Sequence, residues 1–111
     1  MRTNESWSDK MIKECTRNYV LFSGRYESYF DDYIEQMSPK GRAWIFKQEF
    51  TLLSYDPETK TAEIRGQSSN VYTTSDKSCT CPDFQKRLKP CKHMYWLANW
   101  YVENEYGKEN D

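Results

Sequence analysis

Apolar residues in the first third of the chain recur every three or four positions, the spacing that places side chains on one face of a helix. The stripe consists of Ile12, Cys15, Tyr19, Phe22, Tyr26, Phe30, Tyr33 and Met37. It predicts helix over about residues 8–37, ended by the Ser-Pro-Lys-Gly run at 38–41. Because Gly24 lies inside the stripe and residues 19–22 are compatible with a strand, two helices, or a helix and a short strand, are alternatives.

From Trp44 onward apolar and polar residues alternate, which is the period of a half-buried strand. The alternating apolar positions are Trp44, Phe46, Phe50 and Leu52. This strand reaches about Tyr55, and Asp56-Pro57 then forces a turn. Two further strands are expected at residues 61–65 and 71–75, with a turn at 66–70 between them. The middle of the chain therefore predicts a small antiparallel sheet.

A helix is expected again from about Lys92 to Tyr106. Its apolar face consists of Met94, Leu97, Ala98 and Tyr101. The predicted fold class is α+β, in three parts: an N-terminal helical segment packing on the core (1–40), a core of sheet, cysteine-containing knuckle and helix (43–106), and an acidic tail (107–111).

Candidate chemistry concentrates between the sheet and the last helix. Three of the four cysteines and the only histidine follow the pattern C-x-C-x9-C-x-H, formed by Cys79, Cys81, Cys91 and His93. Structural zinc takes four tetrahedral ligands at about 2.0 to 2.3 Å, and two close pairs brought together by a fold supply them. The pattern predicts one Zn²⁺ per chain, bound by three thiolates and one imidazole.

The flanking prolines agree with this geometry. Two positions along a helix rotate a side chain by about 200°, so Cys91 and His93 cannot both face one ion from a helix interior. The pair must straddle a helix start, and Pro90 suits that place. Pro82 disfavours helical backbone at Cys81, which suits the exit of a strand or a tight knuckle.

The alternative is that these are ordinary buried cysteines and a core histidine, with a Cys81–Cys91 disulfide as its main form. Clustering of four residues that can ligate a metal favours metal over that interpretation. Cys15 stands alone on the N-terminal apolar stripe, where a core position is expected rather than a reactive thiol.

The segment C-x-C, Pro-Asp-Phe, a basic loop, and Pro-Cys-Lys-His before an apolar helix resembles a SWIM-type zinc finger. That family is named from bacterial chromatin-remodelling-type ATPases and plant Mutator-type transposases, and also occurs in recombination accessory and ubiquitin-related signalling proteins. The resemblance implies a short sheet followed by a helix around one zinc, a ββα core. It also implies that the ligands are Cys79, Cys81, Cys91 and His93. The resemblance extends over about residues 44–100 and is strongest over 79–93. Residues 1–37 have no counterpart in it.

The length and the net charge limit the classes of function that fit the chain. The chain has 111 residues, which suits one domain, and its 16% aromatic residues can build a core despite a mean hydropathy of -1.03. A net charge of -1 excludes coating of nucleic acid or membranes by bulk electrostatics. Residues 1–13 lack the apolar run of a secretory signal and no later stretch reaches transmembrane length. We expect an intracellular protein, cytoplasmic or nuclear, that is not secreted and does not bind a membrane.

A zinc-dependent enzyme is the weakest functional class. Catalytic zinc keeps an open position for water, whereas the motif fills all four positions. A zinc deaminase would need an H-x-E, and His93 is followed by Met94 and Tyr95. We therefore expect a non-catalytic module with no small-molecule substrate.

Two kinds of partner fit an interaction module. The loop beside the metal carries the cations Lys86, Arg87, Lys89 and Lys92. They suit the phosphate backbone of DNA or RNA, and compensation of the thiolate charge explains them equally well. Alternatively, an adaptor or inhibitor with purely structural zinc would bind a protein through aromatic residues, which include Tyr26, Tyr29, Phe30, Tyr33, Trp96, Trp100 and Tyr101. Packing of the N-terminal helix across the core explains the same aromatics without a partner.

Overall fold

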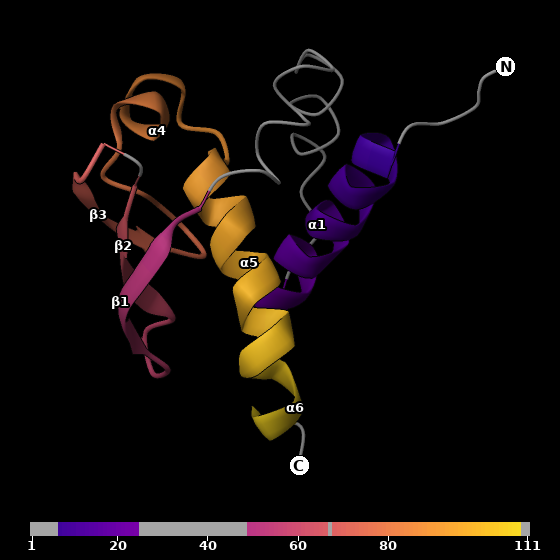
Figure 1. The fold of residues 1–111 in the computed structure, drawn as a ribbon. Helices are drawn as coiled ribbons and strands as arrows, with labels where there is room; N and C mark the ends of the chain where they lie inside the picture. Colours follow the sequence, from indigo (N-terminus) through magenta and orange to yellow (C-terminus); the bar gives the residue numbers. More distant parts are fainter. Residues whose placement is uncertain (1–6, 25–48, 67, 110–111) are drawn as a thin grey trace, which may run out of the picture.

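The computed structural model describes residues 7–24, 49–66 and 68–109. Its elements are α1 (Trp7–Ser23), β1 (Thr51–Asp56), β2 (Thr61–Arg65), β3 (Val71–Ser75), α4 (Pro82–Arg87), α5 (Lys92–Asn104) and α6 (Tyr106–Glu109). Helix α5 lies between the sheet and α1, and α4 sits above the sheet near the start of α5 (Figure 1). The α+β class predicted from the sequence is confirmed, with a helix that follows the cysteine segment.

The sheet is antiparallel with the order β1-β2-β3. Strands β2 and β3 pair in unbroken register from Thr61–Ser75 to Arg65–Val71, and both have the predicted bounds. The pairing of β1 with β2 shifts between Leu52 and Ser54. Strand β1 begins at Thr51, and the expected strand residues Trp44 and Phe46 lie outside the described part of the chain.

The predicted turns follow from local chemistry. Asp56 ends β1, and its carboxylate Oδ1 accepts the backbone N–H of Glu58 at 3.0 Å, which reverses the chain. The second turn closes where the N–H of Gly66 donates to the carbonyl of Asn70 at 2.9 Å. These turns bring β2 into the centre of the sheet.

The core lies between the sheet and α5. Ala62 and Ile64 of β2 are buried and alternate with exposed residues, as a half-buried strand requires. The predicted apolar face of α5 is buried, which confirms Met94, Leu97, Ala98 and Tyr101 as core residues. Helix α5 ends at Asn104, earlier than expected, and α6 continues into the segment predicted as the acidic tail.

Helix α1 ends at a glycine. Gly24 has φ +75°, which glycine adopts without the strain that a Cβ brings, and its N–H donates to the carbonyl of Val20 at 2.7 Å. Residues 8–37 therefore do not form one uninterrupted helix, and residues 19–22 are helix rather than strand. The expected stripe beyond Gly24 lies outside the described residues.

Helix α1 packs against α5 through buried polar and aromatic contacts. The Sγ of Cys15 donates to the carbonyl of Tyr95 at 3.0 Å, and the Nδ2 of Asn18 donates to the Oδ1 of Asn99 at 3.1 Å. One turn away, the rings of Phe22 and Tyr101 lie 4.8 Å apart. Cys15 is 1% exposed, which confirms it as a core residue.

Two contacts tie α1 to the sheet side of the molecule. The hydroxyl of Tyr19 donates to the carbonyl of Asp76, three residues before Cys79. The ammonium of Lys60, in the β1–β2 turn, donates to the carbonyl of Phe22 at 2.8 Å and lies 5.4 Å from the ring centre of Tyr101. A cation at this carbonyl stabilises the C-terminal end of α1.

None of the described helices combines the length and the apolar character that a membrane crossing requires.

Replacing Phe22 by alanine tests whether α1 is part of the core. Phe22 is 0% exposed, so we expect Phe22→Ala to lower the free energy of unfolding by about 3–5 kcal/mol. Leu21→Ala, at a neighbouring position that is 41% exposed, serves as the control and should change it by about 0.5 kcal/mol or less. Urea denaturation measures both, and equal effects would contradict the packing described here.

Candidate metal centre

The four ligand-type residues come from two places in the fold. Cys79 follows β3 and forms an isolated bridge with Thr74, and Cys81 is the N-cap of α4. Cys91 is the N-cap of α5, and His93 lies in that helix's first turn. The end of the sheet and the beginning of α5 thus each contribute one pair.

The first pair is held by a knuckle built on β3. The backbone N–H of Thr80 donates to the carbonyl of Thr73 at 3.0 Å, and the Thr80 hydroxyl accepts the N–H of Thr73 at 3.0 Å. The Nε2 of Gln85 donates to the carbonyl of Cys79 at 2.8 Å. These bonds fix the backbone of Cys79 from both sides.

Cys81 has extended backbone (φ -68°, ψ 154°), as expected before Pro82, and its Sγ accepts the N–H of Phe84 at 3.4 Å. The short helix α4 that follows was not predicted. Its signals were present: Pro82 stands at the first helical position, and Asp83 is acidic in the first turn. A helix of six residues is too short to be recognised from apolar periodicity.

The second pair straddles the start of α5, as predicted. Cys91 has extended backbone (φ -108°, ψ 174°). Its carbonyl accepts the N–H groups of Met94 at 3.0 Å and Tyr95 at 3.1 Å. The helix therefore begins between the two ligands, and both side chains turn toward one point.

All four donor atoms lie within 4.8 Å of one another, and their residues are 0–3% exposed. The Nδ1 of His93 is 3.7 Å from the Sγ of Cys79 and 3.8 Å from the Sγ of Cys91. The edges of a tetrahedron of zinc ligands are roughly 3.5–3.8 Å long, so donor set and spacing both fit a zinc ion. Each of the four cysteines, all in described segments, is free of a disulfide, which argues against the Cys81–Cys91 alternative.

His93 presents Nδ1 to the sulfurs, a choice that the sequence does not determine. Its imidazole lies between two aromatic rings, with centroids 5.0 Å from Phe50 and 4.8 Å from Tyr72. Its Nε2 faces Gly66, where an added Cβ would lie 3.9 Å from it. The two rings hold the imidazole in the orientation that directs Nδ1 at the cysteines.

The three clustered thiols differ in pKa. A hydrogen bond from Cys91 lowers the pKa of Cys79 to about 4 and that of Cys81 to about 6. The same bonds, together with burial, raise the pKa of Cys91 well above its usual value. The buried hydroxyl of Thr74, 3.2 Å from the Sγ of Cys79, also lowers the pKa of Cys79. Two sulfurs are thus ready as thiolates, and the third carries a proton that a metal ion must displace.

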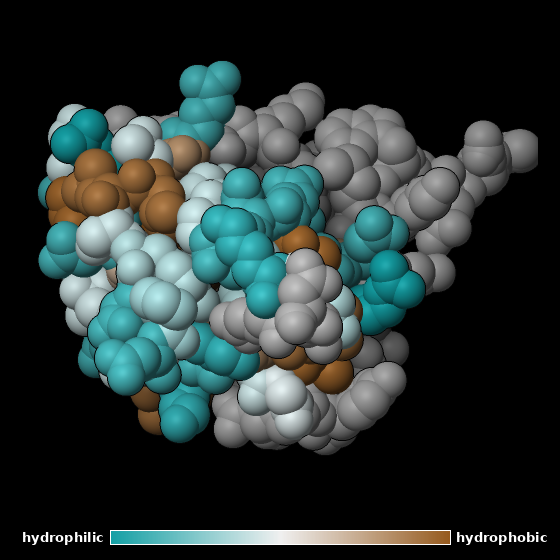
Figure 2. Space-filling view, turned by 90° about the horizontal axis from the view of Figure 1, so that it is seen from below, coloured by the Kyte–Doolittle hydropathy of each residue, from teal (hydrophilic) through white to brown (hydrophobic). Residues whose placement is uncertain are grey.

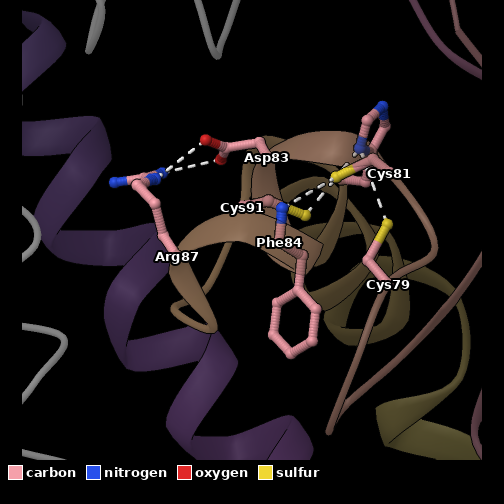
Figure 3. A network of polar contacts seen from close by, with 7 residues as sticks. Cys79, Cys81, Asp83, Phe84, Arg87 and Cys91 are labelled. Atoms are coloured by element: carbon pink, nitrogen blue, oxygen red, sulfur yellow. Dashed lines mark hydrogen bonds and ion pairs between the residues drawn. The ribbon is translucent and has the colours of Figure 1, made fainter.

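The four predicted cations lie in or after α4, and they differ in whether an acid neutralises them. Lys86 and Arg87 lie in the last turn of α4, Lys89 follows, and Lys92 is the first residue of α5. Arg87 donates to both carboxylate oxygens of Asp83, with Nε–Oδ1 2.8 Å and Nη2–Oδ2 2.6 Å. Figure 3 shows this pair on the side of α4 away from the labelled cysteines. Arg87 is thus neutralised locally, which an i,i+4 spacing could have predicted.

The described aromatics are mainly core residues. Phe84, Trp96 and Trp100 are half-buried and pack against the core, and Tyr101 is 2% exposed. Tyr101 therefore belongs to the core, as the interpretation without a partner expects. The N-terminal aromatics Tyr26, Tyr29, Phe30 and Tyr33 lie outside the described residues.

Comparison with known families agrees with this geometry. Residues 70–99, from the end of the β2–β3 turn into α5, match the SWIM zinc finger. These residues carry the SWIM zinc finger pattern. The match includes all four donor residues, whereas α1, β1 and β2 lie outside it. The SWIM finger is a zinc-binding module, and this part of the earlier expectation is confirmed.

Two curated sequences are similar to most of the chain. The gamma-aminobutyric acid type B receptor subunit 1 of Mus musculus and that of Rattus norvegicus are each 25% identical over 105 residues, which is 90% of this chain. The chain spans about a tenth of the length of these receptor subunits, so the similarity assigns no activity to it. No solved structure matches the chain.

The proton held by Cys91 makes metal affinity depend on pH. Zinc must displace at least this proton, so we expect the logarithm of the zinc affinity to fall by about one per pH unit from pH 8 downward. Below about pH 6 the Cys81 thiolate also takes up a proton, and the fall should steepen. Competition with a chelator of known affinity across this range measures the slope. A flat profile between pH 8 and 6 would contradict the proton arrangement.

Proposed function

We propose that this chain is a non-catalytic interaction module in which one zinc ion per chain is bound by Cys79, Cys81, Cys91 and His93 and whose partner is a nucleic-acid backbone. The convergence of four buried donor atoms within 4.8 Å carries the zinc assignment. Four protein ligands fill a tetrahedral shell and leave no position for substrate or water, which is typical of structural zinc. When bound, the ion joins the end of the sheet to the start of α5.

The nucleic-acid assignment is supported by charge near the zinc site. Lys86 is exposed and Lys89 half-buried, and both lie in the segment between the two ligand pairs. The acid in that segment, Asp83, is already paired with Arg87. Two or three lysines can neutralise a few phosphates, so binding should be weak, largely independent of base sequence and sensitive to salt.

A protein partner is the second candidate, and apolar residues on the sheet favour it. Leu53 of β1 is 41% exposed and Val71 of β3 is 48% exposed. Figure 2 shows a mostly hydrophilic face with a hydrophobic area at the left, the side on which the sheet lies in Figure 1. An adaptor would use this area, and zinc would then serve only to hold the fold.

Metal content and ligand substitution test the zinc assignment. Freshly purified protein should contain one equivalent of zinc, and Cys81→Ser or His93→Ala should unfold the sheet and α5. Structural zinc contributes an apparent binding free energy of about 10–16 kcal/mol in finger peptides, whereas the free energy of unfolding of a domain is about 5–15 kcal/mol. Loss of the ion therefore removes as much free energy as holds a domain folded. Elemental analysis and near-ultraviolet circular dichroism give the two readouts.

Cys15→Ser is the matched control, because Cys15 is a buried cysteine outside the site whose hydrogen bond a hydroxyl can replace. It should keep full zinc content and change the melting temperature far less. Chelator-treated wild-type protein that keeps its melting temperature would show that zinc is dispensable for the fold.

Charge reversal in the segment between the two ligand pairs tests the nucleic-acid assignment. Lys86→Glu and Lys89→Glu should each weaken binding to duplex DNA and reduce the slope of log affinity against log salt by about 0.9, the value for one lost phosphate contact. Zinc content should not change, since neither residue is a candidate ligand. Lys108→Glu in α6, at the opposite end of the α5–α6 pair (Figure 1), is the charge-matched control. Wild-type protein without salt-sensitive binding to DNA or RNA at micromolar concentration would favour the protein partner.

A further inference from the structure

Leu88 is the most exposed large apolar residue in the described part of the chain, at 69%. It is the C-cap of α4, with left-handed backbone (φ 58°, ψ 34°), and its N–H donates to the carbonyl of Phe84 at 2.7 Å. This cap position normally takes glycine or asparagine, because a side chain with a Cβ is strained there. Folding alone would therefore favour a different residue at this place.

The surroundings of Leu88 are charged rather than apolar. It is flanked along the chain by Lys86 and Arg87 on one side and by Lys89 on the other. Pro82, Asp83 and Gln85 of the same helix are also exposed. Leu88 is thus the large apolar side chain that this basic segment exposes.

The zinc site fixes where this side chain is presented. Leu88 lies between the N-cap residues Cys81 and Cys91, so the segment is held at both ends by donor residues. The hydrogen bond from Gln85 to the Cys79 carbonyl attaches α4 to the knuckle as well. A segment whose backbone is already fixed loses little backbone freedom when a partner contacts it.

We propose that Leu88 is a wedge that inserts between stacked bases of a nucleic acid whose phosphates are contacted by Lys86 and Lys89; this rests on the nucleic-acid function proposed above. Architectural proteins insert apolar side chains, leucine among them, between base steps, and combine these wedges with Arg and Lys contacts to the nucleic acid. A protein partner fits less well, because a lone leucine buries little of the roughly 1,200–2,000 Å² that a stable protein interface requires.

The test uses the full zinc-loaded chain and two probes, a duplex and a single strand that each carry 2-aminopurine next to a flexible TA step. Wild-type protein should increase the 2-aminopurine fluorescence, because the base loses its stacking neighbour. Leu88→Asn should bind about tenfold more weakly or worse, because a leucine is no longer buried. Binding of Leu88→Asn should leave the 2-aminopurine fluorescence unchanged. Its slope of log affinity against log salt should stay as in wild type, because no phosphate contact is lost.

Three controls separate a wedge from a structural role. Asparagine tolerates left-handed backbone, so Leu88→Asn should keep the wild-type zinc content and melting temperature. Leu88→Gly should behave in the same way and bind as weakly, whereas Leu88→Met, which keeps an apolar side chain, should retain binding. Leu21→Asn removes a leucine of α1 that is 41% exposed and should bind as wild type does.

The outcomes are distinguishable. If wild type and Leu88→Asn bind equally, or if both give the same fluorescence, the wedge is overturned while the nucleic-acid function stands. If Leu88→Asn and Leu88→Gly lose both stability and binding, Leu88 is structural and the wedge is again overturned. If wild type binds neither probe, the wedge and the nucleic-acid function fall together. Capture of a protein from nuclease-treated lysate by wild type and not by Leu88→Asn would then assign Leu88 to a protein partner.

Discussion

The described fold depends on the meeting of two short ligand pairs, one at the end of β3 and one at the start of α5. Helix α4, which lies between the pairs, contains no fully buried residue and so has no core of its own to hold it. It is positioned by Cys81 at its N-terminus and by the bond from Gln85 to the Cys79 carbonyl. A metal ion that bridges Cys79 and Cys81 to Cys91 and His93 would supply the cohesion that a small sheet and a six-residue helix lack.

Helix α1 supports the same arrangement from the other side of α5. It lies outside residues 70–99, yet its Cys15, Asn18 and Phe22 contact α5 directly. The finger in this chain is therefore not a free-standing ββα unit. The tyrosine hydroxyl of Tyr19 also reaches the carbonyl of Asp76, just before the knuckle, so α1 helps to position the first ligand pair.

Much of this was predictable because strong local constraints act on few residues. Alternation and turn residues predict β2 and β3, and Pro82 and Pro90 predict extended backbone at Cys81 and a helix start at Cys91. Other features depend on tertiary contacts. Tyr95 is buried on α5 because α1 packs there, and His93 offers Nδ1 because Phe50 and Tyr72 flank its ring. The sequence left Gly24 open as a break in the first helix, and the structure makes it the helix end. One signal was overlooked: the i,i+4 spacing of Asp83 and Arg87, whose ion pair removes one cation from the basic segment.

The central claim is that one zinc ion is bound by three sulfurs and one imidazole nitrogen. X-ray absorption at the zinc edge of purified protein measures the number, type and distance of the ligands directly. The account predicts three sulfur ligands at about 2.3 Å and one nitrogen at about 2.0 Å, with the multiple scattering of an imidazole. Fewer than three sulfurs, or a shell completed by oxygen, would contradict it.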